Sequence, residues 1–379
     1  MTVVLPPPDL YQLQNEDQII TPALLIYPEI VETNIRIAIG IAGGDPRRWR
    51  PHIKTAKIPY VVKRLIAHGV VQLKCSTTLE LLTACQAGAE DVLLAYAVMG
   101  ANARRVREIA NAFPHVRVSV LVETVEQAAE WIGTPIGVFI DLNSGMNRTG
   151  MDEANFAAVQ GLARTLGKQF RGLHFYDGHM SGVPAAEREA RAHAGYDGLM
   201  QLVNRLIESG IDVQEIITSG TPAAPWAMTY AGFNGQQLIH RISPGTVVYN
   251  DLTSLEQLAG YGFQPAALVL ATVVSRPTGT IVTCDGGHKS VSADAGVPTC
   301  AVLGHPELQP AKPSEEHLPI GCASPDQAPA LGTKLYLVPR HVCPSVNNFD
   351  EALMVRDGRV QSVEKVAARG HENPLLALA

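Results

Sequence analysis

Short apolar runs alternate with helical patterns along the first two thirds of the chain. The runs at 91–97 and 136–143 are almost entirely apolar, which is typical of strands covered on both faces, as in a parallel sheet. Strand-like runs occur at 50–55, 71–76, 91–97, 117–123, 136–143, 170–176, 215–220 and 237–245. Helical patterns separate them, at 58–68, 78–87, 101–113, 124–132, 152–166, 185–209 and 221–232. This alternation predicts an α/β domain built from βα units.

A further strand at 22–27 and a helix at 29–42 precede these units. Eight units after a leading strand fit a closed (β/α)8 barrel of the TIM type better than an open doubly wound sheet. A G-x-G-x-x-G motif does not follow the first strand, which disfavours a dinucleotide-binding fold. We therefore expect a barrel over residues 22–252, with its active site at the carboxyl ends of the strands.

The pattern changes after about residue 265, where apolar runs are separated by turns and not by helices. Strands are predicted at 267–275, 280–284, 300–303, 334–339 and 351–356, and a long loop at 306–327. Asp357-Gly358 lies between two strand-like runs and is a hairpin turn signal. These features predict a mostly β domain made of residues 1–21 and 253–379.

Composition narrows the class of protein. Hydrophobic residues make up 46% of the 379 residues and charged residues 17%, so we expect a large buried core and little disorder. The net charge is −6 and basic residues form no long run, which argues against nucleic acid as a partner. The six cysteines form no C-x-x-C pair, and the chain shows neither a signal-peptide pattern nor an apolar run of membrane-spanning length. We expect a cytoplasmic protein with reduced thiols and no membrane partner.

Two lysines lie where the first predicted barrel strand ends, in Arg50-Pro51-His52-Ile53-Lys54-Thr55-Ala56-Lys57. A lysine at the carboxyl end of a barrel strand suits a Schiff base, and solvated loop charge is the alternative. Position alone allows either Lys54 or Lys57.

Small-residue turns follow the last two predicted barrel strands. They are Ser219-Gly220-Thr221 and Ser243-Pro244-Gly245-Thr246. Such turns let backbone N–H groups approach an anion, and barrel enzymes often bind phosphate with these two loops. An ordinary helix cap by Thr221 is the alternative for the first turn.

Two further strand ends carry candidate ligand contacts. Arg148 lies between glycines, where its guanidinium can reach the barrel mouth and suit a phenolate or carboxylate; a surface loop arginine is the alternative. Tyr176 shares a strand face with His174 and can stack on a ring or form a hydrogen bond; a capped barrel rim is the alternative.

His341-Val342-Cys343 is the best metal candidate. Spacing of two in a strand puts imidazole and sulfur on one face, and Pro344 is expected to end that strand. Histidine with thiolate suits Zn²⁺, with water or substrate completing the shell. His317, in Glu315-Glu316-His317, is a candidate base or outer-shell group of the metal, and solvated loop charge is the alternative.

Taken together, these motifs resemble those of a known family. Over nearly its whole length the chain is similar to the D-threonine aldolase and eukaryotic-type D-serine dehydratase family, the fold-type III pyridoxal phosphate enzymes related to alanine racemase. The most specific segments are 50–57 and 341–347, which lie far apart in the chain.

The resemblance implies roles for individual residues. Pyridoxal 5′-phosphate is held by Lys54 and not Lys57, Arg148 contacts the phenolic oxygen, and Tyr176 contacts the ring. The phosphate cup consists of Ser219, Gly220, Thr221, Gly245 and Thr246. Ser243 replaces the arginine that pairs with the pyridine nitrogen in alanine racemases, so the nitrogen is expected to stay unprotonated.

The resemblance also implies a divalent metal on His341 and Cys343. The second ligand is typically aspartate in characterised aldolases and cysteine in dehydratases, so Cys343 favours Zn²⁺ over Mn²⁺ or Mg²⁺. Candidate general bases are His179, His288 and His317. A homodimer is expected.

The implied substrate is a D-3-hydroxy amino acid, and the expected reaction is retro-aldol cleavage to glycine and an aldehyde. A dehydratase acting on D-serine or D-3-hydroxyaspartate, giving a 2-oxo acid and ammonia, is the alternative. A non-catalytic pyridoxal phosphate or amino-acid binding protein is a further alternative.

Overall fold

The computed structural model describes residues 5–235 and 237–375, and their contacts divide the chain into two compact units. The barrel unit contains Ala38–Lys54, Val62–Gly245 and the described residues from His371 onward. The β-rich unit contains the described residues up to Ile37 together with Thr55–Val61 and Thr246–Gly370. The chain therefore crosses between the units several times, and one crossing follows Lys54.

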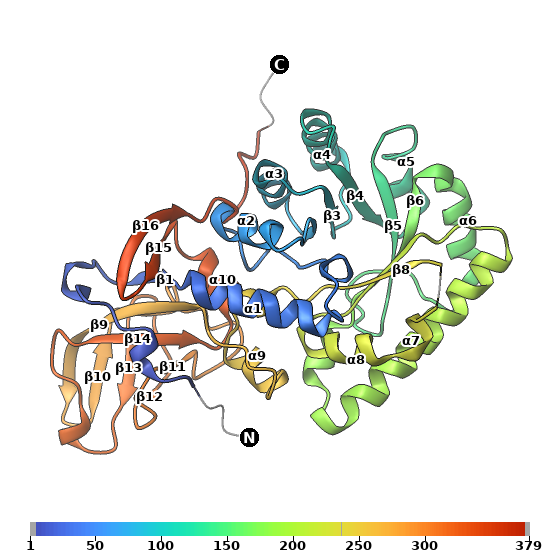
Figure 1. Ribbon diagram of the computed structural model, residues 1–379. Coiled ribbons are helices and arrows are strands. Elements are labelled where there is room, and N and C mark those ends of the chain that lie inside the picture. Colours follow the sequence, from blue (N-terminus) through green and yellow to red (C-terminus); the bar gives the residue numbers. More distant parts are fainter. Residues whose placement is uncertain (1–4, 236, 376–379) are drawn as a thin grey trace. The chain divides into compact units, whose positions relative to one another are not determined.

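A parallel sheet of seven strands, counted over the described residues, forms the barrel unit in the order β2 to β8 (Figure 1). Its strands are β2 (Gln72–Cys75), β3 (Asp91–Leu94), β4 (Arg117–Val122), β5 (Gly137–Leu142), β6 (Phe170–Phe175), β7 (Glu215–Thr218) and β8 (Ile239–Ile242). The connecting helices are α2 (Pro59–Ala67), α3 (Thr78–Ala87), α4 (Gly100–Ala112), α5 (Val125–Ala129), α6 (Phe156–Leu166), α7 (Ala185–Glu208) and α8 (Ala224–Thr229). This confirms the predicted alternation and the TIM-type fold class.

Residues 49–53 lie between β8 and β2, where the barrel needs its eighth strand. Trp49 forms a parallel bridge with Ile242, and His52 forms one with Lys74. The Arg50 N–H donates to the Ile242 carbonyl oxygen at 2.8 Å, and the Lys74 N–H donates to that of Pro51 at 2.9 Å. The regular strand predicted at 50–55 is therefore reduced to isolated bridges, because Pro51 has no N–H to donate to a ladder.

Local sequence signals explain where α3 begins and ends. The Thr77 side chain accepts a hydrogen bond from the Glu80 N–H at 3.0 Å, and the Glu80 carboxylate accepts one from the Ser76 N–H at 2.7 Å. These contacts cap the N-terminus of α3. The same helix ends at Gly88, whose φ of 96° suits glycine.

The β-rich unit is organised around a sheet in the order β12-β13-β10-β9-β1-β15-β16, with β14 paired to β9 and β11 to β14. The strands are β1 (Ala23–Ile26), β9 (Ala267–Thr278), β10 (Ile281–Cys284), β11 (Cys300–Val302), β12 (Gln309–Pro310), β13 (Leu318–Gly321), β14 (Lys334–Pro339), β15 (Glu351–Arg356) and β16 (Arg359–Lys365). Among the described residues, three α-helices accompany them: α1 (Pro28–Ile41), α9 (Leu252–Gln257) and α10 (Val342–Asn347).

The strand predicted at 22–27 exists, but it does not lead the barrel. It is β1, which pairs antiparallel with β9 and parallel with β15. A four-residue apolar run specifies an extended, buried segment and carries no information about which sheet receives it.

The β-rich unit also contains the loop predicted at 306–327 and the turn predicted at Asp357-Gly358. The loop predicted at 306–327 is wrong in part, because β12 and β13 lie within it and β13 pairs with β10. The side chains of Leu318 and Ile320, two positions apart in β13, are buried in the core. This alternation is short, and the surrounding sequence is rich in proline and polar residues, so the strand is hard to recognise from the sequence. The predicted turn at Asp357-Gly358 is confirmed, with φ angles of 50° and 68°.

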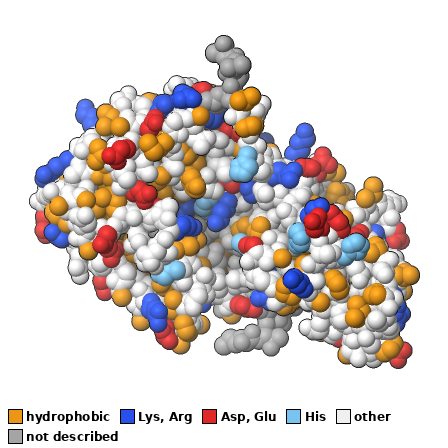
Figure 2. Space-filling model, turned by 180° about the vertical axis from the view of Figure 1, so that it is seen from behind, with side chains coloured by type: hydrophobic (Ala, Val, Ile, Leu, Met, Phe, Trp, Pro, Cys, Tyr) orange, Lys and Arg blue, Asp and Glu red, His pale blue; other side chains and the backbone are white. Residues whose placement is uncertain are grey.

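The surface carries side chains of mixed polarity (Figure 2), and the cysteines are reduced. Acidic and basic side chains are interspersed over the face in Figure 2, and hydrophobic side chains lie among them. The helices of residues 5–235 and 237–375 are too short or too polar to cross a membrane. The cysteines all lie in these described ranges, and each is a free thiol.

Candidate functional site

A cavity of about 570 Å³ opens at the carboxyl ends of the barrel strands. Its walls come from strand ends, including Lys54, Lys74, Glu123, Asp141, Arg148 and Tyr176. All of these residues belong to the barrel unit. This is the end at which barrel enzymes carry their chemistry.

The two lysines of the first motif have different surroundings. Lys54 lines the cavity, and its backbone N–H donates to Nδ1 of His52 at 3.2 Å. Lys57 is buried, and its Nζ donates to the Ala368 carbonyl oxygen at 3.0 Å. The strand-end pattern allows either lysine, but the structure places Lys54 alone of the two on the cavity wall.

Arg148 and Tyr176 also meet at this cavity. The Arg148 guanidinium carbon lies 5.0 Å from the centre of the Tyr176 ring. The same ring covers Gly220, where a Cβ atom would lie only 3.0 Å from it. The arginine loop is held by the Thr149 hydroxyl, which donates to Asp141 Oδ2 at 2.7 Å. The structure therefore brings together Lys54, Arg148, Tyr176 and the first small-residue turn.

A polar chain that the sequence pattern does not single out reaches the same cavity. Lys74 Nζ lies 3.1 Å from Nε2 of His174, and Nδ1 of His174 lies 2.6 Å from Asp141 Oδ1. Lys74 is 2% exposed and His174 is 3% exposed. One feature of the sequence could have indicated this chain: Lys74 lies within the strand-like run 71–76. A buried strand does not normally contain a lysine.

The charges around this chain shift its proton equilibria. Burial and, after it, the charge of Lys54 lower the pKa of Lys74 to about 7, although Asp141 acts in the opposite direction. Burial and the charge of Lys74 also lower the pKa of His174. Burial opposes ionisation of Asp141, but His174 outweighs it and holds the pKa of that carboxyl below its usual range.

The two small-residue turns contain buried hydroxyl groups without a protein partner. Ser219 Oγ and Ser243 Oγ are buried and have no hydrogen-bond partner among the described residues. At Gly245 a Cβ atom would lie 2.3 Å from the His52 carbonyl oxygen, so a side chain does not fit there. A buried hydroxyl without a partner is costly, and an oxygen-rich ligand would remove that cost. These turns fit a cofactor that carries phosphate.

His341 and Cys343 lie in the β-rich unit at the start of α10, and not in the predicted strand. His341 is the N-cap residue and Cys343 belongs to the first turn. Pro344 follows within that turn, where proline is tolerated, so it begins a helix instead of ending a strand. The two side chains still meet at this helix start, where Cys343 forms a hydrogen bond with His341.

The surroundings of this pair suit a metal ligand only in part. His341 Nδ1 lies 2.6 Å from Asp294 Oδ2, and Cys343 Sγ lies 2.9 Å from the Thr55 hydroxyl. Burial opposes protonation of His341, but Cys343 and Asp294 outweigh it and raise its pKa to about 9. Over the described ranges, groups of three or more His, Cys, Asp or Glu side chains that could hold a metal do not occur.

The three candidate bases lie in different places. His179 is in a 3-10 helix at Gly178–Gly182, half-buried, and burial lowers its pKa. It packs near Gly145, in the loop that carries Arg148, but it is not among the residues that line the cavity. His288 and His317 are exposed side chains of the β-rich unit. Their roles as bases stay predictions.

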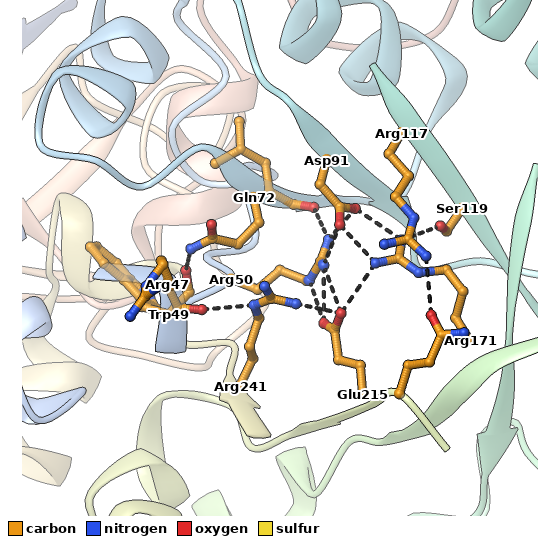
Figure 3. Close-up of polar contacts among 12 residues, drawn as sticks. Arg47, Trp49, Arg50, Gln72, Asp91, Arg117, Ser119, Arg171, Glu215 and Arg241 are labelled. Carbon is orange, nitrogen blue, oxygen red and sulfur yellow. Dashed lines mark hydrogen bonds and ion pairs between the residues drawn. The ribbon is translucent and has the colours of Figure 1, made fainter. Parts of the chain in front are cut away.

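A buried ion network lies at the opposite end of the barrel strands (Figure 3). Asp91 and Glu215 are the first residues of β3 and β7, and Arg50 pairs with both, at 2.9 and 3.0 Å. Arg171 pairs with the same two carboxylates, at 2.7 and 3.2 Å. Burial opposes ionisation of Asp91, but Arg50 and Arg171 outweigh it and hold its pKa well below the usual range. Charged groups at this end of a barrel stabilise the fold and do not take part in the chemistry.

Comparisons with known proteins agree with this arrangement. Residues 26–252 match the alanine racemase N-terminal domain, and residues 266–355 match the "Putative serine dehydratase domain". The chain is 30% identical to a D-threonine aldolase from an Arthrobacter species, over 97% of each chain. The chain belongs to the D-threonine aldolase and eukaryotic-type D-serine dehydratase family of fold-type III enzymes. It is therefore one of the pyridoxal phosphate-dependent lyases.

Other members of the family are similar along most of their length. A 3-hydroxy-D-aspartate aldolase from Paracoccus denitrificans is 26% identical, over 94% of each chain. The crystal structure of a D-threonine aldolase from Filomicrobium marinum superimposes with a TM-score of 0.84 at 27% identity, covering 93% of this chain and 96% of that one. Both units thus have counterparts in this family.

Proposed function

We propose that this chain is a D-threonine aldolase-type lyase, which cleaves D-3-hydroxy amino acids to glycine and an aldehyde. The observation that carries the proposal is the cavity at the carboxyl ends of the barrel strands, in which Lys54 meets Arg148 and Tyr176. The near full-length similarity to a D-threonine aldolase supports the reaction type.

The residues present fit pyridoxal phosphate. Lys54 would hold its aldehyde carbon through the side-chain amine, and Arg148 would pair with an anionic oxygen. The buried hydroxyls of Ser219 and Ser243 would donate hydrogen bonds to oxygen or nitrogen acceptors. When bound, the cofactor takes up the electron pair that the α-carbon keeps after the bond to its neighbour breaks.

His341 and Cys343 would hold a divalent metal, and Zn²⁺ suits this donor pair best. Two side chains fill half of a tetrahedral shell, so water or substrate would complete it. Asp294, on the other imidazole nitrogen, would fix the ring orientation, as carboxylates commonly do for metal-binding histidines. Such a metal would act as a Lewis acid toward the 3-hydroxyl of the substrate.

Dehydration to a 2-oxo acid and ammonia is the second candidate function. The match of residues 266–355 to a serine dehydratase domain favours it, and so does the thiol at position 343. The same lysine, cofactor and metal would serve either reaction, so the products decide between them.

The test is a product assay. The purified protein is loaded with pyridoxal phosphate and with Zn²⁺ or Mn²⁺, then given D-threonine, D-serine or, as a control, L-threonine. Glycine and acetaldehyde from D-threonine alone are the expected products. Pyruvate from D-serine or 2-oxobutyrate from D-threonine would establish the dehydratase instead. Cofactor binding without either set of products would contradict both and indicate a binding protein.

A further inference from the structure

We propose that Lys74 is a second catalytic residue of the cavity, which removes and returns a proton on the α-carbon of the bound amino acid, and that His174 and Asp141 position it. This inference rests on the proposed function only in that an amino acid binds through the cofactor on Lys54.

The geometry is a relay that ends in an amine on the cavity wall. Asp141 accepts from the Thr149 hydroxyl at 2.7 Å with one oxygen, and its other oxygen lies 2.6 Å from His174 Nδ1. A carboxylate at Nδ1 keeps the proton on that nitrogen. Nε2 is then the acceptor that faces Lys74 Nζ at 3.1 Å. The imidazole therefore fixes the direction of the amine while both carboxylate oxygens are used elsewhere.

A purely structural lysine would not need this arrangement. A buried ammonium is normally satisfied by a direct carboxylate partner, because an unpaired charge in the interior costs several kcal/mol. Here an uncharged imidazole stands between Lys74 and Asp141, and the ammonium Nζ also lies 5.3 Å from the centre of the Tyr176 ring. Lys74 lines the same cavity as Lys54 and Arg148. Among the residues that the structure describes, the amine of Lys74 therefore has no direct carboxylate partner in this arrangement, and the cationic side chains of Lys54 and Arg148 line the same cavity.

The charges that face Lys74 set its protonation. Its pKa is lowered to about 7, with burial as the largest cause, and the groups that act on it electrostatically are Lys54, Asp141, Arg50 and Arg148. Asp141 is the one that raises the pKa. At neutral pH a large fraction of Lys74 is therefore the free amine, the form that can accept a proton.

The proposed step balances without a further reactant. The α-carbon–hydrogen bond breaks, the proton forms a new N–H bond on Lys74, and the electron pair left behind is taken up by the cofactor. In the cleavage direction the ammonium form of Lys74, which takes its proton from water, gives that proton to the α-carbon and completes glycine. Because an ammonium exchanges its protons with water, glycine bound in D₂O will gain deuterium.

The experiment measures that exchange directly. The protein loaded with pyridoxal phosphate is incubated with glycine in D₂O, and loss of the α-proton signal is followed by NMR. Lys74→Met should reduce the exchange rate about 100-fold or more, the scale of a lost acid–base group. Lys57→Met is the matched control, since Lys57 does not line the cavity. The absorbance band of the lysine-bound cofactor should be the same in wild type and Lys74→Met.

The pH profile separates proton transfer from a packing role. The wild-type exchange rate should rise with pH, with a midpoint near 7 that Lys74→Met lacks. Asp141→Asn should move the midpoint to lower pH, because the charge that raises the pKa of Lys74 is gone. His174→Gln should slow exchange while the cofactor band stays.

Three outcomes would overturn the inference. They are an exchange rate of Lys74→Met within threefold of wild type, loss of its cofactor band, and a midpoint that does not move in Asp141→Asn. The exchange needs neither the metal nor carbon–carbon cleavage. A protein that exchanges glycine through Lys74 but makes no glycine from D-threonine would refute the proposed function and leave this inference standing.

Discussion

The side-chain amine of Lys57 donates a hydrogen bond to the carbonyl oxygen of Ala368, 3.0 Å away, within the β-rich unit. This contact separates two lysines that are three positions apart in one motif. Lys57 binds the segment that follows β16 (Arg359–Lys365). Lys54 instead lines the cavity.

Lys57→Ala should therefore lower stability and leave cofactor binding intact. Loss of a buried hydrogen bond from a charged donor costs about 1.5–3 kcal/mol. Lys54→Ala should have the reverse effect, with the absorbance band of the bound cofactor lost and stability nearly unchanged. Urea unfolding and the absorbance spectrum check both variants. Survival of the band in Lys54→Ala and its loss in Lys57→Ala would show the lysine assignment to be wrong.

The ion network predicts a large loss of stability from one neutral substitution. Glu215 is 1% exposed and pairs with Arg50, Arg171 and Arg241. Glu215→Gln leaves those guanidinium groups with too little buried negative charge, at a cost of about 3–5 kcal/mol. Glu187→Gln, which breaks the exposed pair with Arg191, should cost less than about 1 kcal/mol. Equal unfolding free energies for the two variants would mean that the network does not stabilise the barrel.

The same network makes stability depend on pH in a defined direction. The pKa of Asp91 is lowered in the folded protein, so its contribution is present above the unfolded pKa of about 4 and is lost as pH falls below it. The difference in unfolding free energy between wild type and Asp91→Asn should be largest at pH 7 and should shrink toward pH 2. Unfolding curves at a series of pH values measure it, and a difference independent of pH would contradict this account.

Much of the barrel could be predicted because its signals are local. The strands β3, β4 and β5 are short, mostly apolar runs that are buried in the structure, and α3 has readable ends at Thr77 and Gly88. The place of the site could be predicted as well, because parallel barrel strands have their carboxyl ends on the same side and barrel enzymes carry their active sites there.

What could not be predicted depends on contacts between distant segments. β1 looks like a barrel strand, but its partners Ala267–Thr278 and Glu351–Arg356 lie more than 200 residues away. A role for Lys74 could not be predicted, because it depends on the contact with His174, which lies 100 positions further along the chain. The spacing of two that predicts a strand at His341-Val342-Cys343 is also met by an N-cap residue and the first helical turn.

The thiol of Cys343 predicts a metal preference that one substitution should change. Thiolate favours Zn²⁺, whereas carboxylate suits Mn²⁺ and Mg²⁺. Cys343→Asp should therefore weaken Zn²⁺ binding by about tenfold or more relative to Mn²⁺, the scale of one altered ligand. Competition titrations with a chelating dye measure the ratio, with Cys322→Ser as the control thiol. An unchanged ratio would exclude Cys343 as a ligand.

The buried hydroxyls of Ser219 and Ser243 allow a prediction that separates folding from cofactor binding. Neither oxygen has a hydrogen-bond partner among the described residues. Removing an unsatisfied buried hydroxyl relieves a desolvation cost, so Ser219→Ala and Ser243→Ala should leave the cofactor-free protein as stable as wild type or more stable. A loss of more than about 1 kcal/mol in urea unfolding would show that the hydroxyls have a structural role.

Cofactor binding should then distinguish the two serines. A hydrogen bond to a charged phosphate contributes about 1.5–3 kcal/mol, so Ser219→Ala should weaken binding of pyridoxal phosphate at least about tenfold. It should not affect pyridoxal, which has no phosphate. The resemblance implies that Ser243 faces the pyridine nitrogen, which both compounds contain, so Ser243→Ala is expected to weaken both by a similar factor. Titrations followed by absorbance give the four dissociation constants. If Ser219→Ala weakens pyridoxal as much as pyridoxal phosphate, the first turn does not bind the phosphate.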